Sequence, residues 1–156
     1  MADWSALLLE RTTGAGQAAA ALGYAAFSVA MMLGRFSGDW AVSRLGRRRA
    51  LRWSGLAAAG MAMALVAPYW LAVLGLGVAG VGYANLVPIL FSAGGKRAGG
   101  AGIAAVSTLG YAGFVVGPPC IGALSAVSGS LPLALAPVAA FGVAIALGAG
   151  AVERRR

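Results

Sequence analysis

Residues 34–49 read Gly-Arg-Phe-Ser-Gly-Asp-Trp-Ala-Val-Ser-Arg-Leu-Gly-Arg-Arg-Arg, a polar and strongly basic segment between long apolar stretches. No Asp, Glu, Lys or Arg occurs in residues 12–34, 53–95 or 98–152. A helix that crosses a membrane needs about 20 largely apolar residues. The first stretch is therefore long enough for one spanning helix, and each of the other two is long enough for a pair.

The composition of the whole chain agrees with a membrane protein. Of its 156 residues, 60% are hydrophobic and 10% are charged, whereas a soluble domain is about 25% charged. The chain therefore lacks the polar groups to cover its own surface in water. This excludes a soluble enzyme, a disordered tail and a coiled coil.

Turn signals divide the apolar stretches into helices. Pro68-Tyr69-Trp70 interrupts the second stretch, because proline disfavours helix at the preceding residue and Tyr and Trp favour the membrane interface. Residues 128–132, Ser-Gly-Ser-Leu-Pro, interrupt the third. The sequence predicts an all-α, polytopic membrane helix bundle in residues 12–156, with five spanning helices at about 16–37, 50–67, 70–92, 102–126 and 131–151.

The first residues form a separate short apolar segment. Residues 1–11 are too short to span a membrane, and they lack the basic start of a signal peptide. We expect this segment to be the outer end of a further helix that the chain contains only in part.

The distribution of basic residues predicts the orientation of the bundle. With alternating topology, 12 Lys and Arg residues fall almost entirely on one side of the membrane, and Arg11 alone lies opposite. Cytoplasmic segments carry the excess of Lys and Arg. We therefore expect the Arg-rich segment and the C-terminus in the cytoplasm. The net charge of +8 then reflects orientation, and we expect no nucleic-acid partner.

An eight-residue pattern occurs twice in the chain. Residues 22–29 read Leu-Gly-Tyr-Ala-Ala-Phe-Ser-Val, and residues 109–116 read Leu-Gly-Tyr-Ala-Gly-Phe-Val-Val, so six of eight positions agree. The agreement can arise by chance in an Ala- and Gly-rich sequence. It can also arise from an inverted-topology repeat of three helices, which builds many secondary transporters.

The basic segment contains an ordered motif. An acid lies near the end of one predicted helix, a glycine permits a tight turn, and an arginine cluster opens the next helix. Retention of positive charge in the cytoplasm would need only an arginine run, so it accounts for this order less well. The acid could instead pair with a nearby arginine and tie helices together. The motif residues are Gly34, Gly38, Asp39, Arg44, Gly46, Arg47 and Arg48.

This segment resembles the signature of the major facilitator superfamily, which reads Gly, three residues, Asp, Arg, any residue, Gly and two basic residues. Residues 44–48 match its second part, but Ser43 stands where the family usually has Asp, and the nearest acid is Asp39. Residues 2–7, 82–91, 110–113 and 117–122 are similar to the end of helix seven and to helices ten and eleven of bacterial members related to sugar permeases of the fucose-permease type. The resemblance implies half of a twelve-helix fold with an inverted three-plus-three repeat, in a bacterial inner membrane.

The resemblance also implies which helices line a central cavity. In the family these are helices seven, eight, ten and eleven, and the predicted helices here would be eight to twelve. The cavity candidates are Tyr24, Phe27, Asn85, Ser107 and Tyr111. A polar amide in hydrocarbon needs a partner, so Asn85 fits a helix–helix hydrogen bond as well as a solute contact. Aromatic packing is the alternative for the two tyrosines.

Proline and glycine mark candidate hinges. Pro88, Pro118 and Pro119 lie within predicted helices, where proline removes a backbone hydrogen bond and bends the helix. Gly117 lies beside the last two. Gly113 and Gly117 are four residues apart, which suits close helix packing. We take packing as their first role and a gating movement as a hypothesis.

Two functions fit these observations. The first is secondary transport of a small polar solute such as a sugar, by alternating access, with a six-helix N-terminal half as partner. The second is a non-transporting membrane module that assembles with another protein. The chain has no His and no acid in a predicted span, so we expect no enzyme, cofactor or metal site.

Overall fold

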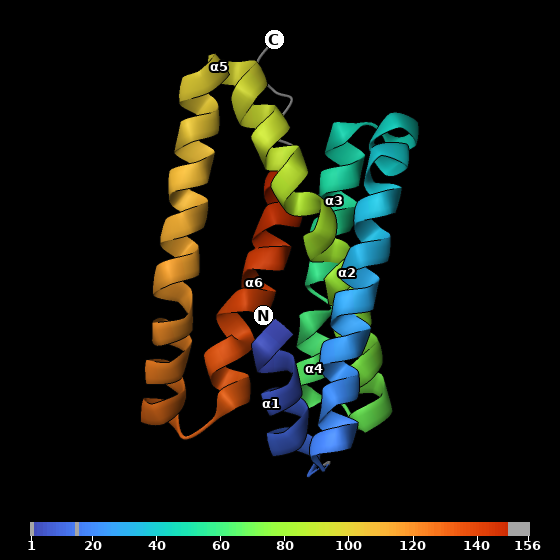
Figure 1. Ribbon diagram of the computed structural model, residues 1–156, viewed down its shortest axis with the longest axis vertical. Coiled ribbons are helices and arrows are strands. Elements are labelled where there is room, and N and C mark those ends of the chain that lie inside the picture. The colour runs from blue at the N-terminus through green and yellow to red at the C-terminus, as the bar shows by residue number, and fades with distance from the viewer. Residues whose placement is uncertain (1, 15, 150–156) are drawn as a thin grey trace.

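The computed structural model describes residues 2–14 and 16–149, and every regular element in these ranges is a helix (Figure 1). The predicted all-α helix bundle is confirmed. The helices are α1 (Ala2–Thr13), α2 (Gln17–Leu45), α3 (Arg47–Ala58), α4 (Met61–Val66), α5 (Tyr69–Ser128) and α6 (Leu131–Gly148).

Helix α5 is two helices joined by a sharp bend. Its backbone leaves helical geometry at Ala98, with φ −142° and ψ 21°, and at Gly99, with φ 55° and ψ −134°. We call residues 69–97 the first arm and residues 100–128 the second arm. Both arms extend beyond the predicted helices 70–92 and 102–126. Figure 1 shows the bend at one end of the molecule: the first arm runs toward it, and the second arm runs away from it in the opposite direction.

Helix α2 continues past position 37, where the sequence predicted its end, and stops at Leu45. Gly38 and Asp39 are therefore helical and do not lie in a loop. The chain turns at Gly46 alone, which has φ 77° and ψ 157°. Only glycine adopts this backbone conformation without strain, so the glycine of the basic motif makes the turn into α3.

The predicted helix 50–67 is interrupted. It begins earlier, at Arg47, and breaks at Ala59 and Gly60 between α3 and α4. The Ala59 carbonyl accepts from the Ala62 amide at 2.8 Å and the Gly60 carbonyl from the Met63 amide at 3.0 Å. These i-to-i+3 bonds satisfy the backbone groups through the break.

Helix α6 starts at the predicted position, after a turn with φ 64° at Gly129. The Ser130 side chain caps it by accepting from the Leu133 amide at 3.5 Å. Residues 150 and 151, predicted as its end, and the three arginines at 154–156 lie outside the described residues.

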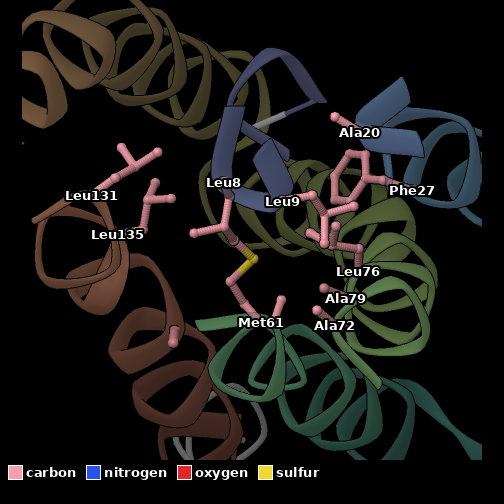
Figure 2. Packing of buried hydrophobic residues seen from close by; sticks show 12 residues of the cluster. Leu8, Leu9, Ala20, Phe27, Met61, Ala72, Leu76, Ala79, Leu131 and Leu135 are labelled. Carbon is pink, nitrogen blue, oxygen red and sulfur yellow. The ribbon is translucent and has the colours of Figure 1, made fainter. Parts of the chain in front are cut away.

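The main hydrophobic core lies where α1, α2, α4, α5 and α6 meet. Leu8 and Leu9 of α1 are fully buried, and they meet Met61 of α4, Leu76 of α5 and Leu135 of α6 (Figure 2). A second cluster forms between α3 and the first arm around Leu51, Leu86 and Ile89. The short segment 1–11 therefore supplies central core residues to this bundle.

Glycines allow the first arm to lie close to its neighbours. A β-carbon on Gly82 would collide with the backbone of Ser54, Ala57 and Ala58 in α3, and one on Gly80 would meet the Phe27 carbonyl of α2. Small residues at helix interfaces permit such close approach of backbones. The first arm is thus held between α2 and α3.

Three of the described helices have segments that are long and apolar enough to cross a membrane: Gln17–Gly38 of α2, the whole of α5, and Leu131–Gly148 of α6. Helices α3 and α4 are separately too short. Each arm of α5 exceeds the length of about 20 residues that one crossing needs.

Candidate functional site

A pocket of about 130 Å³ lies between α2 and the first arm of α5. Its walls follow one face of each helix, because positions i, i+3, i+4 and i+7 lie on the same side of a helix. Helix α2 contributes Arg35, Gly38 and Val42, and α5 contributes Asn85, Pro88, Ile89 and Ser92.

Asn85 connects the two walls of this pocket. Its Oδ1 atom lies against the backbone of Gly38, at the place that a β-carbon on residue 38 would occupy. The amide therefore touches the facing helix and also borders the pocket. The sequence left two roles open for Asn85, a contact between helices and a contact with a solute. In the structure Asn85 lies at a helix interface and also borders a pocket.

Pro88 also lines the pocket. It lies within α5, where the backbone keeps helical geometry. Because proline has no N–H group, the carbonyl of Ala84, one turn earlier, lacks its donor within the helix. The first arm thus contributes the Asn85 amide and the Pro88 ring to the lining of the pocket.

The remaining cavity candidates do not join this pocket. Phe27 is only 2% exposed, and its ring lies 6.3 Å from that of Tyr83 at a 47° angle, so it packs in the core. Tyr24 on α2 is 46% exposed and Tyr111 on the second arm is 74% exposed. Ser107, also on the second arm, donates to the Ile103 carbonyl at 3.0 Å.

The repeated segments containing the two tyrosines lie on opposite sides of the molecule. In Figure 1, α2 and the second arm of α5 are separated by other helices, and they run in opposite directions. An inverted repeat requires antiparallel helices. The arrangement agrees with that expectation but does not bring Tyr24 and Tyr111 to one site within this chain.

The second arm packs against little of the described chain. Leu109, Phe114 and Val127 are exposed, and a β-carbon at Gly113 or Gly117 would meet nothing within 4 Å. Pro118 and Pro119 also lie in this arm and keep helical geometry. Its candidate hinge and packing residues thus face open space here.

Most of the described basic residues gather at one end of the bundle, whereas Arg11 lies in α1. The connection between α2 and α3 lies at the same end as the bend of α5, which follows Lys96 and Arg97 (Figure 1). Arg44 and Arg48 are exposed beside the first of these connections. Asp39 and Arg47 lie in described helices, but their side chains are outside the described part of the structure.

Arg35 and Ser92 were not among the predicted site residues. Arg35 was counted only toward the charge distribution, and Ser92 carried no signal of its own. Positions 35, 38 and 42 share one helix face, as do 85, 88, 89 and 92. That spacing could have indicated that each helix carries polar side chains on one face, but it could not have indicated that the two faces meet.

Comparison with known proteins gives similarity along the whole chain. It is 38% identical to an uncharacterised MFS-type (major facilitator superfamily) transporter of Yersinia pestis over 159 residues, 99% of this chain. It is 40% identical to membrane protein MosC of Rhizobium meliloti over 161 residues, and 33% identical to an uncharacterised transporter of Sinorhizobium fredii over 128 residues. The relatives are transporters by name in two of these three cases.

The chain spans 41%, 39% and 34% of the lengths of these relatives. No protein-family profile and no solved structure matches it. Together with the membrane-length apolar helices, the similarity to these bacterial proteins indicates a membrane protein. The all-helical architecture is consistent with half of a major facilitator bundle.

Proposed function

We propose that this chain forms the C-terminal half-bundle of a secondary transporter of the major facilitator superfamily in a bacterial inner membrane. The observation that carries the proposal is the similarity of 99% of the chain to an MFS-type transporter. The bundle of membrane-length helices supports it. The basic segment, with its turn at Gly46, is the cytoplasmic connection of this half.

We further propose that transport needs a six-helix N-terminal half. Two observations support this partner. The chain corresponds to 41% of the transporter that it resembles, and the second arm of α5 exposes large apolar side chains along its length. A partner half would bury part of that surface, and the cavity would form between the halves.

The proposed cargo is a small polar solute, with sugars as the first class to test. Asn85 supplies an amide that can both donate and accept hydrogen bonds. Tyr24 and Tyr111 are exposed, so their aromatic rings and hydroxyl groups are open to a solute or to a partner half. Alternating access would then expose this cavity to each side of the membrane in turn.

A chimera tests this function directly. This chain would replace the matching segment of the Yersinia pestis relative, and uptake of a panel of radiolabelled sugars would be measured in proteoliposomes. The controls are the intact relative, the relative without that segment, and this chain alone. We expect the chimera to transport at least one solute that the last two controls do not.

Two results would contradict the proposal. Uptake by the isolated chain would remove the need for a second half. A correctly folded chimera that transports nothing, although the intact relative transports a solute from the panel, would favour a non-transporting membrane module.

A further inference from the structure

The pocket between α2 and the first arm of α5 combines a positive charge with neutral polar groups. Arg35 supplies a guanidinium group, Asn85 an amide and Ser92 a hydroxyl. The other lining residues are the bare backbone of Gly38 and the apolar side chains of Val42, Pro88 and Ile89. A site of this composition favours an oxygen-rich anion, because guanidinium and amide donors bind oxyanions.

The guanidinium group of Arg35 makes only a weak contact within the described side chains. Its Nη2 atom donates to the Sδ atom of Met31 at 3.9 Å, and a thioether sulfur is a weak acceptor. Arginine presents several donors in a fork that matches phosphate and carboxylate oxygens. A phosphate oxygen in the pocket would be a much stronger acceptor for Arg35 than this sulfur.

The size of the pocket limits what it can hold. A pocket for a drug-sized molecule has a volume of about 300–1,000 Å³, whereas this one has about 130 Å³. It can therefore hold one small anionic group, and the rest of a larger ligand would lie outside it. A phosphate group fits both this volume and the donors.

The position of the pocket in the bundle agrees with a phosphate ligand. Arg35 and Gly38 lie at the end of the apolar segment Gln17–Gly38, where a spanning helix meets the interface. This is also the end of the bundle at which most of the exposed basic residues gather (Figure 1). Basic pockets between helices at this depth bind phosphate-bearing headgroups.

We propose that this pocket binds a single phosphate group at the basic end of the bundle, held by Arg35 and Asn85. The group can come from an anionic phospholipid headgroup or from a soluble phosphate, and the binding chemistry is the same for both. The proposal does not depend on solute transport.

Thermal unfolding of the purified full chain in neutral detergent tests the proposal. One arm adds phosphatidylglycerol, a second adds inorganic phosphate, and a third adds phosphatidylcholine as a zwitterionic control. We expect phosphatidylglycerol or inorganic phosphate to raise the unfolding midpoint more than phosphatidylcholine does. Protection by phosphatidylglycerol alone identifies a headgroup site, and protection by inorganic phosphate identifies a site for a soluble anion.

Three variants separate the pocket from general charge attraction. Arg35→Gln removes the guanidinium group and should weaken apparent binding by about tenfold or more, as loss of a charged hydrogen bond does. Val42→Phe keeps every charge but fills the pocket, and it should weaken binding as well. Arg49→Gln removes an exposed arginine that does not line the pocket, and it should leave binding within about twofold.

The proposal is overturned if neither phosphatidylglycerol nor inorganic phosphate protects the wild-type chain. It is also overturned if Arg35→Gln and Arg49→Gln weaken binding equally, because the ligand would then bind the basic end without using the pocket. If Arg35→Gln fails to fold, Val42→Phe decides: unchanged binding in that variant rejects the pocket, and lost binding supports it.

Discussion

The Oδ1 atom of Asn85 in α5 occupies the space beside Gly38 in α2 that a β-carbon would fill. Helix α5 therefore places a polar side chain in the space that opens because Gly38 of α2 has no side chain. This contact sets the distance between α2 and the first arm where their pocket opens. It also gives the half-buried Asn85 amide a polar backbone as its neighbour between two apolar helices.

Replacing Gly38 with alanine should destabilise the bundle through Asn85. The new β-carbon would displace the Oδ1 atom, and we expect a loss of about 1 kcal/mol in the free energy of unfolding, since a flexible side chain can partly move away. The measurement is a denaturant titration in mixed micelles. The same substitution should cost less in an Asn85→Ala background, and an equal cost in both backgrounds would show that the contact is not the cause.

Replacing Gly82 with alanine should cost more than replacing Gly38. A β-carbon at Gly82 would collide with backbone atoms of Ser54, Ala57 and Ala58, and backbone cannot rotate away as a side chain does. We expect a loss of about 2–3 kcal/mol in the free energy of unfolding. Gly77→Ala is the matched control, because nothing lies within 4 Å of a β-carbon there, and a loss of similar size in the control would contradict a steric cause at Gly82.

The sequence predicted the helical bundle and most of its turns because those signals are local. Charged and proline-containing segments mark several helix ends in the sequence: Lys96 and Arg97 precede the bend of α5, and Pro68 precedes its start. The turn at Gly46 was also readable, because a glycine beside an arginine cluster is typical of a tight turn between two helices. These turns can therefore be predicted without knowing which helices contact each other.

Other features depend on tertiary contacts and gave no local signal. The break at Gly60 lies in an apolar run without proline. At this break the Gly60 carbonyl approaches Gly75 of the first arm so closely that a β-carbon at position 75 would lie 2.9 Å from its oxygen. Helix α2 continues through Gly38, which lies against Asn85 of another helix. The pocket was missed for the same reason, since Arg35 and Ser92 are 57 positions apart in the numbering and become neighbours only when α2 meets α5.

Replacing Gly46 with alanine should strain the turn between α2 and α3. The residue has φ 77° and ψ 157°, a region that other residues rarely adopt, and we expect a cost of about 1–3 kcal/mol in the free energy of unfolding. Nothing lies within 4 Å of a β-carbon at this position, so the backbone conformation would be the sole cause. Gly16→Ala is the control, because Gly16 has φ −61° and the same open surroundings. A cost that is equal at both positions would reject the role of Gly46.

The orientation of the bundle can be tested with single cysteines in a Cys120→Ser background. Ser43 and Ser128 are a matched pair: both are exposed, and their hydroxyl groups donate to the Trp40 carbonyl at 2.8 Å and the Leu124 carbonyl at 2.6 Å. Ser43 lies beside the basic end, and Ser128 lies at the turn into α6 at the opposite end (Figure 1). Because cytoplasmic segments carry the excess of basic residues, a membrane-impermeant maleimide added to intact cells should label Ser128→Cys and not Ser43→Cys. Permeabilised cells should allow labelling of both, and labelling of Ser43→Cys alone in intact cells would reverse the predicted orientation.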